Sequence, residues 1–298
     1  MLVSDSDLNV LTRNQRTLSK VVSISGIGIH SGKSVTLTLC PADPNTGVVF
    51  QRMDLPGEPL IPASVDHVVN TNRSTTIGIK DAFVNTVEHV CAALKAYEVD
   101  NVLVQVSDQE TPIGDGSSRV FVEMIEESGI EEQSETTSIV KIDRPVFWSK
   151  GETYLVALPH YDFRVSYSLH YPNAKLLQNQ FHTITLSPEI FKEEIASCRT
   201  FSCYGEVQPL MDQGLIKGGS LENTLVIKDD AVLNPKGLHF ENEMARHKLL
   251  DLIGDFSLTG LNLHAHIIGY RTGHDANIQF AKELRDSINT EKLTCQSM

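Results

Sequence analysis

Residues 86–104 have the sequence TVEHVCAALKAYEVDNVLV, in which a helical pattern of apolar residues passes into the apolar run of a strand. Four apolar side chains recur at helical spacing and predict one buried face: Val87, Val90, Cys91 and Leu94. Glu88 and His89 lie on the opposite arc, where their neighbours are mainly alanines. Because alanine leaves the backbone accessible, we expect another group to approach this face beside an ionisable pair.

A segment of the second half repeats this order. Residues 244–265, MARHKLLDLIGDFSLTGLNLHA, predict a helix with a histidine in its first turns, followed by a strand. Strands and helices without regular βαβ alternation favour an α+β fold over a doubly wound sheet. We therefore expect two similar domains, each a sheet packed with helices. The acidic, polar stretch EEQSETTS at 131–138 is the predicted linker between domains at 1–130 and 139–298.

The remaining elements are predicted from alternating or helical apolar spacing. We expect a hairpin within 21–40 and strands at 46–52, 75–80, 101–107, 139–148, 153–159, 163–171, 223–229 and 261–270. Further helices are expected at 117–129, within 187–220, at 241–257 and after residue 274.

Composition indicates an ordinary globular protein. Of 298 residues, 41% are hydrophobic and 21% charged, which is enough for two domain cores. No apolar run approaches the roughly 18–20 residues of a membrane span, and the first residues lack the apolar segment of a secretion signal. Five widely spaced cysteines without a CxxC pair suit reduced thiols, so we expect a cytoplasmic protein. The formal net charge of −13 disfavours nucleic-acid binding, and an anionic substrate would need a local cluster of cations.

The loop GIGIHSGKS at 26–34 resembles a phosphate-binding loop but fails its spacing. A P-loop needs glycine where Ile27 stands, and the dinucleotide version needs one where Ser31 stands. After Ser34 the sequence alternates as a strand instead of opening a helix. A hairpin turn is the better interpretation.

The segment RHKLLDLIGD at 246–255 carries the strongest chemical signal. His247, Asp251 and Asp255 share one helical face, opposite an apolar one. His247 and Asp251 are one turn apart, about 6 Å, so both can reach one ion at about 2.0–2.2 Å. An intrahelical ion pair on a solvated face explains the same spacing. With His89 as a second imidazole, the set matches a catalytic zinc site that keeps its fourth position open.

Two further residues have candidate roles in acid–base chemistry. Glu88 adjoins His89 and could take a proton from a water near the metal, although Asn85 and Glu88 also fit a capping box. The sequence leaves both explanations open. His274, in RTGHDAN, is expected at a strand-to-helix junction, as a general acid oriented by Asp255 or as an ordinary surface residue. His264 and His266 alternate on one strand face and are weaker candidate ligands.

Several motifs occur in an order that is typical of a known family. They are QRTLSKVVSISGIGIHSGKSVTLTLCPADPNTGVVF, TVEH, PIGDGS, HKLLDLIGD and the GH at 273–274. From about Gln15 to the helix after His274, the chain resembles the family of UDP-3-O-acyl-N-acetylglucosamine deacetylases. This resemblance implies a zinc-dependent amidohydrolase that removes the N-acetyl group in the committed step of lipid A synthesis. It also implies two similar α+β domains with the active site between their helices.

The resemblance implies a role for each matching residue. His89, His247 and Asp251 match the zinc ligands. Glu88 matches the general base, His274 the general acid and Asp255 the carboxylate that holds His274. The matches to substrate contacts are Thr200 beside the oxyanion, Phe201 at the glucosamine ring, Lys248 near the diphosphate, and Val207, Ile216, Gly219 and Ser220 along an acyl-chain tunnel. The chain departs from the family pattern in GHDANI, where GHALNN is frequent.

Two other functions stay open at this point. One is a zinc hydrolase acting on another N-acyl or peptide substrate. The other is a non-catalytic protein that binds sugar nucleotides. We expect a monomer without a transmembrane segment, with Zn²⁺ as cofactor, the UDP-sugar as substrate and no nucleic-acid partner.

Overall fold

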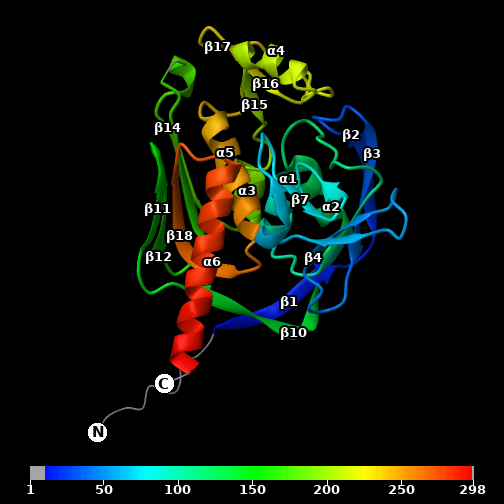
Figure 1. Cartoon of the computed structure of the whole chain (residues 1–298), viewed down its shortest axis with the longest axis vertical. Coiled ribbons are helices and arrows are strands. Elements are labelled where there is room, and N and C mark those ends of the chain that lie inside the picture. The colour runs from blue at the N-terminus through cyan, green and yellow to red at the C-terminus, as the bar shows by residue number, and fades with distance from the viewer. Residues whose placement is uncertain (1–10, 173, 297–298) are drawn as a thin grey trace.

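The computed structural model describes residues 11–172 and 174–296. Separate sheets and packed helices occur in both halves of this part of the chain (Figure 1), so the predicted α+β class is confirmed. Among the described residues, no helix combines the length and apolar character needed to cross a membrane.

The N-terminal half contains a five-stranded sheet in the order β2-β3-β9-β4-β5. Its strands are β2 (Val22–Ile27), β3 (Ser34–Pro41), β4 (Val48–Arg52), β5 (Leu60–Pro62) and β9 (Val102–Val106). β2 pairs antiparallel with β3, from Val22 opposite Leu39 to Ile27 opposite Ser34, which confirms the predicted hairpin. A smaller sheet follows the 3-10 turn η1 (Val65–His67) and consists of β6 (Val68–Asn70), β7 (Thr76–Ile79) and β8 (Ala82–Val84).

Two helices pack in this half, α1 (Glu88–Ala96) and α2 (Arg119–Ser128). α2 is amphipathic and buries Phe121, Val122 and Ile125. In α1, by contrast, both the valine-rich face and the alanine-rich face are buried, with only Lys95 partly exposed. The alanine face is therefore covered by another element.

The C-terminal half is built around a seven-stranded sheet, which β1 from the N-terminal half joins at one edge; its path is β1-β10-β18-β12-β11, and β13 pairs with both β18 and β14. Its strands are β1 (Thr12–Leu18), β10 (Ile130–Lys141), β11 (Val146–Lys150), β12 (Thr153–Pro159), β13 (Arg164–Leu169), β14 (Gln180–Thr185) and β18 (Asn262–Tyr270). A small outlying sheet contains β15 (Phe201–Cys203), β16 (Leu225–Lys228) and β17 (Ala231–Val232).

The helices of this half pack on the large sheet, against α1 or beside the small sheet. They are α3 (Pro188–Glu194), α4 (Tyr204–Asp212), α5 (Glu243–Ser257) and α6 (His274–Gln296), with a 3-10 turn η2 (Lys175–Leu177). α5 contacts β13 and β14, and α6 contacts β12, so both helices pack on the sheet. Figure 1 shows α4 near β16 and β17, apart from the large sheet.

Residues 131–138, predicted as a linker, are a strand instead of a loop. They lie within β10, which pairs antiparallel with β1 and then, at residues 139–141, parallel with β18. β10 is exposed over most of its length, so its sequence lacks the apolar alternation that marks a strand. Pairing with distant strands produces its conformation, and the division into two domains stays a prediction.

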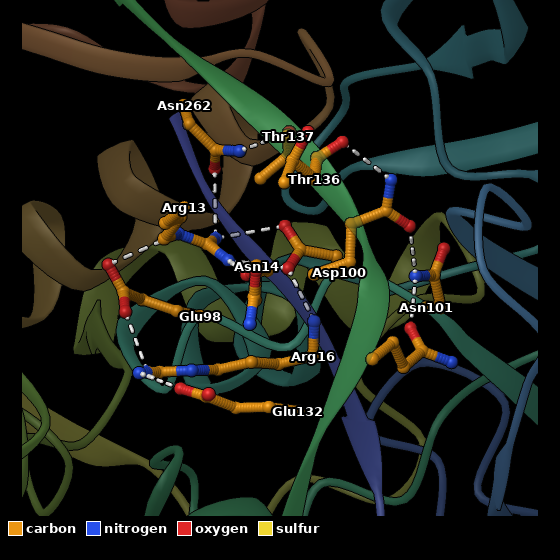
Figure 2. A network of polar contacts seen from close by, with 12 residues as sticks. Arg13, Asn14, Arg16, Glu98, Asp100, Asn101, Glu132, Thr136, Thr137 and Asn262 are labelled. Carbon is orange, nitrogen blue, oxygen red and sulfur yellow. Dashed lines mark hydrogen bonds and ion pairs between the residues drawn. The ribbon is translucent and has the colours of Figure 1, made fainter. Parts of the chain in front are cut away.

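A polar network connects the β1–β10 ribbon to both halves (Figure 2). The Arg13 guanidinium in β1 donates to both carboxylate oxygens of Asp100, at 2.6 and 2.9 Å. The Arg13 guanidinium also lies 3.5 Å from the amide oxygen of Asn262, whose amide nitrogen donates to the Thr137 hydroxyl at 3.0 Å. This network fixes the turn after α1 and the first residue of β18 to the same ribbon.

The two halves meet most closely where α1 packs against α5. A Cβ built on Gly254 of α5 would lie 2.1 Å from the carbonyl oxygen of Glu88, so only glycine fits at this crossing. The alanines of α1 and this glycine bring the two backbones together. Buried apolar residues of both halves form one continuous core around the contact.

Candidate active site

The α1–α5 contact brings together the three predicted ligands. His89 extends from α1, and His247 and Asp251 extend from α5. Asp251 Oδ1 lies 3.4 Å from His247 Nε2 and 3.8 Å from His89 Nε2, and one potential ligand atom from each residue lies within 4.8 Å of the others. Two ligands that bind one tetrahedral ion at about 2.0–2.2 Å are about 3.4 Å apart. The geometry therefore fits a single metal ion.

The chemistry of these side chains also fits a metal. Asp251 Oδ1 is buried and has no hydrogen-bond partner among the described residues, an unfavourable state that a cation would relieve. Nδ1 of His247 lies 3.0 Å from the carbonyl oxygen of Cys198, so its Nε2 is the free nitrogen that faces Asp251. Burial lowers the pKa of His89 to about 3 and also lowers that of His247, which keeps both imidazoles neutral. Neutral imidazole is the form that binds metals.

The second oxygen of Asp251 is held by a neighbouring lysine. Lys248 Nζ donates to Asp251 Oδ2 at 2.7 Å, one helical turn away. Burial alone would raise the pKa of Asp251, but Lys248 and the neighbouring histidines together outweigh burial, and the pKa of the carboxyl is lowered. Lys248 Nζ also lies 5.8 Å from the centre of the Phe201 ring, within reach of a cation–π contact.

A carboxylate–imidazole pair lies beside the candidate ligands. His274, the first residue of α6, places Nε2 3.9 Å from Glu88 Oε1. Its Nδ1 lies 2.9 Å from Asp255 Oδ2, and Asp255 is fully buried. The expected strand-to-helix junction at His274 is confirmed.

The capping-box explanation of Glu88 is wrong. Helix α1 begins at Glu88 itself and has no side-chain cap. Asn85 instead accepts a hydrogen bond from the Thr76 hydroxyl at 2.9 Å, and the Glu88 carboxylate accepts one from the backbone N–H of Thr75 at 3.0 Å. The Glu88 carboxylate therefore lies inside the site and does not cap the N-terminus of its own helix.

Burial and neighbouring charges act in opposite directions on the pKa of each member of this pair, and both pKa values end above their ordinary values. Burial raises the pKa of Glu88 to about 8, against the opposing effect of His274. Burial would lower the pKa of His274, but the nearby Asp255 carboxylate, by charge and hydrogen bonding, raises it to about 9. Perturbed acid and base groups that face each other in a cavity are typical of catalytic sites.

A polar cavity of about 410 Å³ opens over the site. Its lining includes Glu88, His89, His247, Thr200, Phe201 and Lys248, together with Lys150. The turn PIGDGS fixes Thr200, because the carbonyl oxygen of Gly116 accepts from the Thr200 backbone N–H at 2.8 Å. The structure thus places the predicted contacts Thr200, Phe201 and Lys248 together.

A second cavity of about 400 Å³ shares Glu88, His89, Thr200 and Phe201 with the first and is mainly aliphatic beyond them. All four residues predicted for the acyl-chain tunnel line it: Val207, Ile216, Gly219 and Ser220. Ile216 has φ +50°, a conformation that is rare for a β-branched residue. Such strain is maintained only where the surrounding structure holds the residue in place.

The weaker candidate ligands lie elsewhere. His266 Nε2 lies 2.7 Å from the Ser166 hydroxyl, and His264 occurs in no metal-type cluster of the described residues.

The glycine-rich loop at 26–34 binds a carboxylate of its own chain instead of a phosphate. The Glu110 carboxylate accepts from the backbone N–H groups of His30 and Ser31 at 2.9 and 2.8 Å.

Sequence analysis missed three features of the site. Asn277 donates to Asp255 Oδ2 at 2.8 Å, and its position one turn after His274 was a helical signal that could have indicated it. Arg73, which lines both cavities, forms an ion pair of 2.8 Å with Glu206 of the polar cavity. Thr75 contacts both Glu88 and Asp255, and nothing in its sequence neighbourhood marks it.

These features, a metal-type triad beside a carboxylate–imidazole pair, are those of a metallohydrolase. The sequence model of the UDP-3-O-acyl N-acetylglycosamine deacetylase family matches residues 15–286, so the chain belongs to this family. A UDP-3-O-acyl-N-acetylglucosamine deacetylase of Chlamydia felis is 48% identical over 279 residues, 94% of this chain and 99% of the relative. Proteins of the same name from Chlamydia pneumoniae and Chlamydia trachomatis serovar L2 are 46% and 43% identical, over 94% and 95% of this chain and 99% of each relative.

Proposed function

We propose that the protein is a zinc-dependent deacetylase that hydrolyses the N-acetyl group of UDP-3-O-acyl-N-acetylglucosamine in lipid A synthesis. The observation that carries the proposal is the position of the His89–His247–Asp251 cluster. It lies beside the Glu88–His274 pair, where a polar cavity meets an aliphatic one. A substrate with a charged nucleotide, an amide and an acyl chain matches this combination.

His89, His247 and Asp251 would hold the zinc ion. Nitrogen and carboxylate donors without cysteine are common in catalytic zinc sites. When bound, zinc supplies Lewis acidity toward the amide carbonyl and lowers the pKa of a water molecule toward about 7. Lys248 holds Asp251 Oδ2, which leaves Oδ1 directed at the two imidazoles.

Glu88 and His274 would move the protons of the reaction. The Glu88 Oε2 atom is held by Thr75, so Oε1 is the atom that accepts a proton from the attacking water. His274 faces the same region through Nε2 and donates a proton to the departing amine nitrogen. Asp255 holds Nδ1 of His274 and stabilises its protonated form.

Other residues would bind the substrate. The Thr200 hydroxyl donates to the oxygen that becomes negative during attack, the Phe201 ring packs on the glucosamine, and Lys248 attracts the diphosphate. The aliphatic cavity, with Val207, Ile216, Gly219 and Ser220, receives the 3-O-acyl chain. We further propose that the protein acts as a monomer in the cytoplasm, without a nucleic-acid partner.

A direct test measures acetate release from two substrates, one with and one without the 3-O-acyl chain, together with zinc content. We expect activity that depends on the acyl chain and about one zinc ion per protein. Equal turnover of both substrates would favour hydrolysis of other N-acyl compounds. Tight binding of UDP-sugar without turnover by the zinc-loaded protein would favour the non-catalytic alternative.

A further inference from the structure

Thr75 lies immediately before β7, is fully buried and belongs to no recognisable motif. Each of its polar groups has a partner at the site. Its backbone N–H donates to Glu88 Oε2 at 3.0 Å, and its carbonyl oxygen accepts from the Val87 N–H at 3.2 Å. Its hydroxyl donates to Asp255 Oδ1 at 2.5 Å. Thr75 therefore touches two carboxylates that come from different halves of the chain.

The hydroxyl of Thr75 completes the set of donors around Asp255. The Oδ2 atom of Asp255 faces His274 Nδ1 at 2.9 Å and Asn277 Nδ2 at 2.8 Å. Among the described side chains, the Thr75 hydroxyl is the one that donates a hydrogen bond to Oδ1 of Asp255. Because the terminal torsion of an aspartate has a broad energy profile, contacts on one oxygen alone leave the carboxylate plane weakly defined. A donor on the second oxygen fixes that plane, and with it the direction of the His274 ring.

The backbone of Thr75 acts on Glu88 in the same way. It holds Oε2, so that Oε1 faces His274 Nε2 at 3.9 Å. Resting on the proposed function, we infer that Thr75 is a positioning residue that sets the mutual orientation of the general base Glu88 and the general acid His274. It acts on His274 through Asp255 and does not touch the substrate.

Three substitutions separate this role from simple packing. Thr75→Val keeps the shape and the backbone N–H but removes the hydroxyl, whereas Thr75→Ser keeps the hydroxyl. Thr76→Val is the matched control, since Thr76 is also buried and its hydroxyl donates to Asn85 outside the acid–base pair. The measurements are kcat and KM on the acylated UDP-sugar, zinc content and thermal midpoint.

We expect Thr75→Val to lower kcat about ten- to hundredfold, a part of the roughly 10²- to 10⁴-fold that a correctly positioned acid or base contributes. Its KM and zinc content stay those of the wild type, because no substrate or metal contact changes. Thr75→Ser restores kcat, and Thr76→Val retains it whatever its effect on the thermal midpoint. A positioning role predicts this pattern, and a purely structural role does not.

Other outcomes overturn the inference. The inference is overturned if Thr75→Val has the kcat of the wild type. It is also overturned if the fall in kcat is fully explained by an equal fall in bound zinc. If Thr75→Val does not fold, Thr75→Ala replaces it, and wild-type kcat in that variant would be equally contrary. An inactive wild-type protein with full zinc would reject the proposed function and this inference together, whereas an active wild type with unaffected Thr75 variants rejects the inference alone.

Discussion

At the scale of single residues, burial decides the chemistry of Glu88. A carboxyl group on the outer face of α1 would have an ordinary pKa, but the approach of α5 and α6 encloses it and raises its pKa to about 8. The same enclosure places its Oε1 atom 3.9 Å from His274. The raised pKa of Glu88 therefore depends on helices from the other half of the chain, which cover its side chain.

Glu88→Gln tests this role without changing the size of the side chain. We expect turnover to fall about 10²- to 10⁴-fold, the usual contribution of a general base, with zinc content unchanged. Glu123→Gln, on the exposed face of α2, is the control and is expected to match the wild type. Wild-type turnover in Glu88→Gln, or a fall in thermal midpoint with intact activity per folded molecule, would reject the assignment.

At the scale of elements, the site depends on the close crossing of α1 and α5. The alanines of α1 and Gly254 of α5 allow this approach, since the carbonyl of Glu88 occupies the space that a Cβ at position 254 would need. His89 and His247 then lie with ring centres 5.1 Å apart and ring planes nearly perpendicular. A small increase in helix separation would move ligands of different helices apart.

Gly254→Ala should therefore impair both stability and metal binding. Alanine adds about 1 kcal/mol of helix propensity, but a Cβ at 2.1 Å from a backbone oxygen forces the helices apart, and overpacking typically costs about 1–3 kcal/mol or more. We expect a lower thermal midpoint and weaker zinc binding. Gly205→Ala in α4, where a Cβ meets nothing within 4 Å, is the matched control and is expected to lose neither property. Equal behaviour of the two variants would contradict the close-crossing explanation.

At the scale of the whole molecule, the β1–β10 ribbon and its polar network hold the two halves in register (Figure 2). The Arg13 and Asp100 side chains are only 17% and 15% exposed, so their ion pair is better shielded than a surface pair. Asp100 also accepts from the Arg16 backbone N–H at 2.9 Å. Loss of the Asp100 charge thus weakens three hydrogen bonds at once.

We expect Asp100→Asn to lower the free energy of unfolding by about 1–3 kcal/mol, as is usual when partners of a part-buried charge are lost. Glu98→Gln is the control in the same network. Its side chain is 46% exposed, so its ion pairs should contribute at most about 1 kcal/mol. Zinc content should be unchanged in both variants, and chemical denaturation measures the difference. Equal losses in the two variants would show that the network does not stabilise the junction.

Local sequence patterns predicted much of this molecule, and their limits have a physical cause. Helical spacing identified His247 and Asp251, and the alanine face of α1 indicated a close neighbour. The strand at 131–138 escaped detection because both of its faces are largely exposed, so no apolar alternation marks it. Thr75 escaped because its partners lie 13 and 180 residues away, and only the folded chain brings them together.

The most direct measurement is X-ray absorption at the zinc edge of the purified protein. If His89, His247 and Asp251 hold the ion, the spectrum will show nitrogen and oxygen ligands at about 2.0–2.2 Å, with imidazole scattering. His247→Ala will lose zinc or change this pattern, while His264→Ala, in β18 and outside the ligand cluster, will preserve it. A sulfur ligand at about 2.3 Å, or an unaltered spectrum with full zinc in His247→Ala, would contradict the account.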